Sequence, residues 1–285
     1  MRVQRGFLAL TMALLPAVAS AQQEPKTPDT SSVYCSGIVT DEAVPNDTSI
    51  ISGEQSNHKI AFAQGDLVYI NKGSKQGAHV GDEFLVQRPV KERIEHNWFK
   101  WQSQLHHAMG QQYLDLGRLR VVNVQADVST AEVIFSCEYM QRGDTVLPFV
   151  PRPAPPFKSE KNFDRFAPVS GKPVGMVVTT KNFGQLAGEN IIVYVNVGST
   201  QGVKTGDYLR VFRYQGSGTE TAYQTAGTAY KFYGFGSAPV RYTWDGLPRE
   251  ILGEGLVLRL APNAATVLIT LSLREIFAGD YIEVE

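Results

Sequence analysis

Several features of metal-binding and catalytic proteins are missing from this chain of 285 residues. It has two cysteines, no Cys-x-x-Cys motif and no histidines four residues apart, so the ligand spacing of a zinc site is absent. No Gly-x-Ser-x-Gly elbow occurs, and the stretch ending Ser170-Gly171-Lys172-Pro173 has Phe166 where a phosphate loop needs its first glycine. We therefore expect no cofactor, no metal and no catalytic activity.

An excess of one charge and long apolar runs are missing too. The chain has 27 basic and 28 acidic residues, and a nucleic-acid-binding surface needs a basic excess or stripe. The apolar run Phe7 to Val18 is shorter than the roughly twenty residues that span a bilayer as a helix, and no later run is longer. We expect no nucleic-acid partner and no transmembrane segment.

The first residues have the three parts of a secretory signal peptide. Arg2 and Arg5 precede the apolar run, and Ala19-Ser20-Ala21 follows it with the small residues that signal peptidase requires. Residues 1–21 are therefore predicted to direct export to the periplasm or the extracellular space. No cysteine stands at the predicted cleavage site, which argues against a lipid anchor, and association with the outer membrane stays open.

The two cysteines, Cys35 and Cys137, are expected to form a disulfide. An exported chain matures in an oxidising compartment, where a pair of cysteines is most simply a disulfide. Two free thiols or a metal site are the alternatives.

A repeat organises the rest of the chain. Val68-Tyr69-Ile70-Asn71-Lys72-Gly73-Ser74-Lys75-Gln76-Gly77 recurs 125 positions later as Val193-Tyr194-Val195-Asn196-Val197-Gly198-Ser199-Thr200-Gln201-Gly202. Downstream the offset is 136, as in Leu116-Gly117 and Leu252-Gly253. Upstream, Gly37-Ile38-Val39 matches Gly175-Met176-Val177 at an offset of 138. The framework is duplicated, and the insertions differ between the copies.

The repeat sets the domain boundaries. Copy one spans residues 33–150 and copy two spans 172–285, with a disordered N-terminus at 22–32. Between the copies, 151–171 begins with the proline-rich stretch Pro151 to Pro156, which favours extended backbone and predicts a semi-rigid spacer.

Each copy is expected to form a small β-barrel or sandwich of five or six strands. Arg118 to Val124 and Thr130 to Cys137 are rich in β-branched residues and flank a short loop, which predicts a hairpin. Five Gly-Asp pairs, at 65–66, 81–82, 143–144, 206–207 and 279–280, predict turns, because glycine accepts positive φ and aspartate bonds its own backbone. The fold class is mainly β, with two tandem domains.

One short helix is predicted in copy one, over Trp98 to Met109. The residues Trp98, Trp101, Leu105, Ala108 and Met109 form an apolar stripe at helical spacing. The stripe is expected to pack on its own barrel. Alternatively it is offered to a partner protein, because tryptophan is enriched in interface hot spots. Trp98 and Trp101 are therefore candidate binding residues.

A second candidate binding surface is the aromatic, glycine-bearing loop of copy two, within residues 214–250. Aromatic rings on such a loop stack on sugars, seat a peptide or plug the end of a barrel. The candidate residues there are Tyr230, Phe232, Tyr233, Phe235 and Trp244.

The repeated motif, followed by Val80-Gly81-Asp82-Glu83-Phe84-Leu85-Val86, resembles the C-terminal module of flagellar assembly protein T. The whole chain resembles an uncharacterised family of exported bacterial envelope proteins, some labelled as peptidoglycan-binding. The resemblance implies a bacterial envelope setting and carries over no functional residue.

Three functions follow from these observations. The first is a non-catalytic binding or assembly module of the periplasm or envelope, with a protein partner. The second is a glycan- or peptidoglycan-binding protein that uses the aromatic loop. The third is an envelope hydrolase, because two distant carboxylates can converge without leaving a motif.

Overall fold

The computed structural model describes residues 26–91, 98–159, 163–214 and 248–285. These residues are mainly β, as predicted. Helix in the described ranges is limited to α1 (Thr30–Tyr34), α2 (Gln102–Met109) and the 3-10 turns η1 (Ser74–Gln76) and η2 (Ser199–Gln201). None of the helices described is long and apolar enough to cross a membrane. The predicted signal peptide lies outside the described residues, and α1 begins inside the stretch expected to be disordered.

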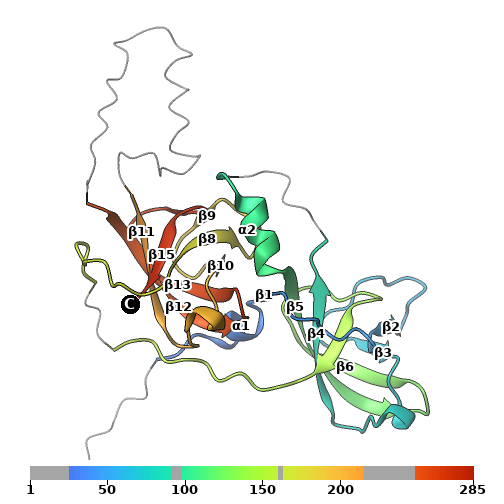
Figure 1. The fold of residues 1–285 in the computed structure, drawn as a ribbon. Helices are drawn as coiled ribbons and strands as arrows, with labels where there is room; N and C mark the ends of the chain where they lie inside the picture. The colour runs from blue at the N-terminus through green and yellow to red at the C-terminus, as the bar shows by residue number, and fades with distance from the viewer. Residues whose placement is uncertain (1–25, 92–97, 160–162, 215–247) are drawn as a thin grey trace, which may run out of the picture.

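Copy one forms a curled seven-stranded sheet in the order β2-β3-β6-β5-β4-β7, and β1 pairs with β5 (Figure 1). Its edges approach each other, because Ser49 bridges to Thr145 and the Ile50 N–H donates to the Asp144 carbonyl at 3.0 Å. Its strands are β1 (Ile38–Thr40), β2 (Ile50–Gly53), β3 (Leu67–Ile70), β4 (Glu83–Pro89), β5 (Gln111–Val124), β6 (Ser129–Ser136) and β7 (Thr145–Pro148).

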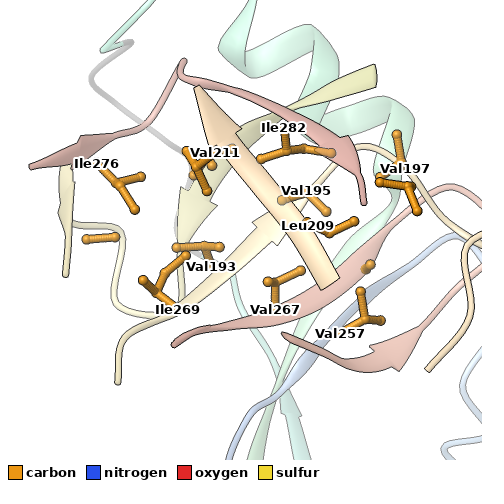
Figure 2. Packing of buried hydrophobic residues seen from close by; sticks show 14 of the residues in the cluster. Val193, Val195, Val197, Leu209, Val211, Val257, Val267, Ile269, Ile276 and Ile282 are labelled. Atoms are coloured by element: carbon orange, nitrogen blue, oxygen red, sulfur yellow. The ribbon is translucent and has the colours of Figure 1, made fainter. Parts of the chain in front are cut away.

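Copy two is a closed barrel in the order β10-β13-β12-β11-β15-β8, beside a two-stranded sheet of β9 and β14. Figure 2 shows its valines, leucines and isoleucines pointing into one core. Its strands are β8 (Val174–Thr180), β9 (Leu186–Ala187), β10 (Ile192–Val195), β11 (Tyr208–Arg213), β12 (Glu250–Leu260), β13 (Ala265–Ser272), β14 (Ile276–Phe277) and β15 (Tyr281–Val284).

The duplicated motif makes the same contacts in both copies. The Gly73 N–H donates to Gln76 Oε1 at 2.8 Å, and the Gly198 N–H donates to Gln201 Oε1 at 2.7 Å. A Cβ on Gly73 would stand 2.5 Å from the Gln125 carbonyl oxygen, so this repeated position admits only glycine. The repeat therefore encodes a fixed strand, 3-10 turn and hairpin contact.

All five Gly-Asp pairs form the predicted turns. Each glycine has a positive φ, and each aspartate accepts a hydrogen bond from the N–H three residues earlier. The donors are Ala63, His79, Gln141, Lys204 and Phe277, at 2.6 to 2.8 Å. Two of the aspartates, Asp144 and Asp280, also form ion pairs with Arg88 and Arg213, at the same place in each copy.

The upstream offset of 138 is wrong, and the structure gives 127. Ile50 pairs with Ile70, and Val177 pairs with Val195. The Ser49 N–H and the Met176 N–H each donate to the asparagine of the motif, Asn71 or Asn196, at 2.6 Å. β2 is therefore the counterpart of β8, and β1 is a strand added to copy one.

The predicted disulfide is present between Cys35 and Cys137, whose Cα atoms are 5.5 Å apart. It ties the segment that follows α1 to the turn after β6. The segment between the copies is also anchored. The Lys158 N–H donates to the Tyr208 hydroxyl at 2.9 Å, and its ammonium forms ion pairs with Glu254 and Glu285. Residues 157–158 therefore lie against copy two rather than spanning free solvent.

Candidate functional site at the junction of the two copies

The two copies meet through an apolar cluster. Figure 1 shows α2 beside β8 of copy two. Val39 and Met109 of copy one pack with residues of β8, β10, β12 and β13, all with little or no exposure; these are Val178, Ile192, Tyr194, Leu256, Leu258 and Leu268. Burying apolar side chains of this size stabilises an interface by about 1.5 to 3 kcal/mol each, before the loss of chain entropy. The copies therefore form one packed body.

A buried charge cluster lies in the same junction. The Asp115 carboxylate has no exposed surface and accepts hydrogen bonds from Arg152 and Arg259, each at 3.1 Å at its shortest. It also accepts from the Gly37 N–H at 3.0 Å and from Gln87 Nε2 at 2.8 Å. One carboxylate thus joins copy one, the segment between the copies, and copy two.

Burial and ion pairing shift the pKa of Asp115 in opposite directions. Burial raises the pKa of a carboxyl group, but the guanidiniums of Arg259 and Arg152 outweigh it and hold the pKa of Asp115 below its ordinary value. The carboxylate therefore stays ionised in the folded protein. With its oxygens held by four donors, it serves as an interdomain contact.

The disulfide segment supplies the next contacts of the junction. The Tyr194 hydroxyl donates to the Ser36 carbonyl at 2.8 Å, and the Gly37 carbonyl accepts from Arg259 at 3.2 Å and from Thr266 at 3.3 Å. Burial raises the pKa of Tyr194, so its hydroxyl remains a donor. Cys35 therefore fixes the backbone on which copy two docks.

The predicted helix is present but shorter, and it packs differently. It begins at Gln102 rather than Trp98, with Trp101 as its N-cap. The expectation that it packs on its own barrel is wrong, because Gln102 Nε2 donates to the Val178 carbonyl of copy two at 2.7 Å. Phe99 is buried beside Gly279, where an added Cβ would lie 2.9 Å from the Phe99 ring. The helix therefore packs against copy two of the same chain.

Trp101 lies between Phe99 and Gln102 in the sequence and faces solvent. Its side chain is 59% exposed, and its backbone has a φ of 74°, in the left-handed region that bulky residues rarely adopt. Lys100 Nζ lies 4.9 Å from the centre of the indole ring. Buried Phe99 on one side and buried Gln102 on the other hold the backbone in this conformation and leave the indole displayed.

The other candidate residues have different positions. Trp98 is half-buried, and its backbone N–H donates to Gln102 Oε1 at 2.8 Å, so Trp98 supports the start of α2. Tyr230, Phe232, Tyr233, Phe235 and Trp244 lie outside the described residues. At the edge of that loop, Tyr214 is described and packs on Phe212 and Tyr281, with ring centres 5.4 and 5.1 Å apart.

A cleft of about 780 Å³ opens in copy two between β9 and the turn after β13. Leu186 and Leu273, which are 55% and 45% exposed, lie on its two sides. Its remaining lining residues are Arg165, Ala187, Gly188, Ser272, Arg274 and Glu275. β9 pairs with β14, and the chain continues from β14 to Gly279. Phe99, which precedes α2, packs on Gly279. The cleft and the start of α2 therefore lie at the same end of the barrel.

The charge cluster and the cleft were both missed in the sequence. The available signal for the cluster was Asp115 between Leu114 and Leu116, an acid within an apolar strand segment. Its two arginine partners, Arg152 and Arg259, stand 37 and 144 residues away, beyond the reach of any local pattern. Among the described residues, no group of three or more metal-ligating side chains occurs.

Comparison of the sequence with models of protein families finds no match, and comparison with curated proteins finds none either. The function is therefore inferred from the residues of this chain.

Proposed function

We propose that the chain is an exported, non-catalytic module that binds a protein partner in the bacterial envelope, with Trp101 as an anchor. The observation that carries the proposal is the exposure of Trp101 on a strained backbone. A bulky residue in this region costs about 1 to 3 kcal/mol, and such strain concentrates at functional positions. Tryptophan is also enriched among the residues that dominate binding energy.

Two further observations support the setting and the absence of catalysis. The Cys35–Cys137 disulfide fits an oxidising compartment outside the cytoplasm. The buried carboxylate of the junction is engaged by two guanidiniums, one amide and one backbone N–H, which suits a structural contact. The bacterial setting is part of the proposal and rests on the resemblance of the repeated motif alone.

The first test is cross-linking from position 101. A photoreactive phenylalanine derivative there, in intact cells, should capture one envelope protein that mass spectrometry identifies. The purified partner is then titrated against wild type, Trp101→Ala and the control Ile60→Ala, which removes a side chain that is 82% exposed in copy one. Loss of about 2 kcal/mol, or roughly 30-fold in Kd, is expected for Trp101→Ala and none for Ile60→Ala.

A companion variant separates binding from folding. Trp101→Asn should also lose the partner, but its unfolding free energy should equal or exceed that of wild type, because asparagine tolerates positive φ. If Trp101→Ala bound as wild type does, the anchor would be wrong. Co-sedimentation of wild type and of Trp101→Ala with peptidoglycan sacculi, in the absence of any protein partner, would favour the glycan-binding function instead.

A further inference from the structure

We propose that the cleft between β9 and the turn after β13 binds an extended segment of the partner protein, which adds to β9 as a strand. This inference depends on the proposed function, since it names the kind of partner surface that the module recognises. The segment would carry apolar side chains for Leu186 and Leu273 and an acidic side chain for Arg165.

The backbone of β9 supplies the first argument. In the described structure β9 has one strand neighbour, β14, and the Gln185 carbonyl accepts from the Ala278 N–H on that side at 2.9 Å. Neighbouring residues of a strand direct their N–H and C=O groups to opposite sides. The backbone groups of Leu186 therefore face away from β14, where an added strand would find them.

The lining of the cleft supplies the second argument. A Cβ built on Gly188 would meet no atom within 4 Å, so a main chain can approach there closely. Arg274 is paired with Glu250 at 2.7 Å, whereas Arg165 forms no ion pair within the described residues. Among the described residues that line the cleft, none has an aromatic side chain on which a sugar ring would stack. A partly apolar peptide with one acidic side chain for Arg165 fits these groups, and Glu275 in the lining disfavours further acids.

Copy one supplies the third argument. Ser136 Oγ donates to the Glu138 carbonyl, and Ser272 Oγ donates to the Arg274 carbonyl, so the turns after β6 and β13 correspond. Leu273 then occupies the position of Cys137 in copy one. There the disulfide between Cys137 and Cys35 holds the N-terminal segment of the chain over the turn. At this position copy one holds a polypeptide segment, and copy two leaves an exposed leucine.

The test uses a random octapeptide phage library selected on full-length wild-type protein and on the Leu186→Asp/Leu273→Asp variant. Val80→Asp, at a side chain that is 66% exposed in copy one, is the matched control. We expect wild type and Val80→Asp to enrich peptides with alternating apolar residues and an acid. Synthetic versions should lose at least tenfold in affinity on the double variant, and about threefold on Arg165→Gln.

A second measurement does not depend on how the variants fold. The selected peptide is synthesised with N-methyl groups on odd or on even backbone nitrogens. Strand addition requires that one series lose binding and the other keep it, whereas side-chain recognition alone affects both alike. No enriched peptide, equal loss in both series, or binding of tetra-N-acetylglucosamine with no peptide would overturn the inference.

Its failure differs from failure of the proposed function. Should the library select nothing while Trp101→Ala still loses the cross-linked partner, the cleft assignment is wrong and the anchor stands. Should both fail, neither Trp101 nor the cleft binds a protein partner.

Discussion

Asp115 carries the largest consequence of any single residue in the junction. Removing one member of a buried ion cluster leaves the other charges desolvated and unpaired, which costs about 3 to 5 kcal/mol. Arg152 and Arg259, both mostly buried, would lose their shared counter-charge in Asp115→Asn. An exposed pair, by comparison, contributes at most about 1 kcal/mol.

We therefore expect Asp115→Asn to lower the unfolding free energy by about 3 kcal/mol at pH 7, measured by urea denaturation. Asp127→Asn, which breaks the exposed pair with Lys75, should change it by less than about 0.5 kcal/mol. The folded pKa of Asp115 is lowered from 3.8, so its contribution is complete above about pH 3.8 and is lost as the pH falls through the folded pKa. The difference in unfolding free energy between wild type and Asp115→Asn should become smaller below pH 3.8. A difference that does not change with pH would contradict the charge argument.

Residue-scale chemistry also shows what a sequence can and cannot predict. The Gly-Asp turns were predictable because both partners of each hydrogen bond lie within three residues. The exposure of Trp101 was not, because it results from Phe99 and Gln102 docking on copy two, far along the chain. Trp101 could be named as a candidate, but its backbone conformation could not.

Among the elements, the short segment from Val33 to Gly37 combines one contact that the sequence predicted, the disulfide, with hydrogen bonds to copy two that it could not reveal. Cys35 attaches it to copy one, while the carbonyls of Ser36 and Gly37 accept hydrogen bonds from copy two. Its three-residue match to copy two gave the wrong offset, because a Gly-Ile-Val pattern fits any buried strand. The hydrogen bonds of Asn71 and Asn196 fix the correct register, and those partners are over twenty residues apart for Asn71.

We expect the Cys35→Ser/Cys137→Ser variant to lose about 2 to 4 kcal/mol in urea denaturation, because the disulfide closes a separation of 102 residues. Hydrogen exchange should also accelerate in β10, where Tyr194 donates to the released segment. Dithiothreitol should produce the same loss in wild type and no change in the variant. Unchanged exchange in β10 would mean that the disulfide stabilises copy one alone.

On the scale of the whole molecule, the junction joins the curled sheet of copy one to the closed barrel of copy two, which the duplication would allow to fold separately. Domains joined by a linker move independently unless a large apolar interface holds them. Here the interface includes an apolar cluster, a buried ion cluster and a segment tied by a disulfide. The surfaces near Trp101 and the cleft are therefore held in one fixed arrangement, and the proposed partner would meet both in a constant geometry.

This arrangement predicts cooperative unfolding. Calorimetry of wild type should give one transition whose calorimetric and van't Hoff enthalpies agree, because neither copy loses the junction without the other. Met109→Asp places an unpaired charge in the apolar cluster and should split the transition in two, whereas Val80→Asp at an exposed position should not. Two separate transitions in wild type would show that the copies are independent, and a partner could then not depend on their fixed relation.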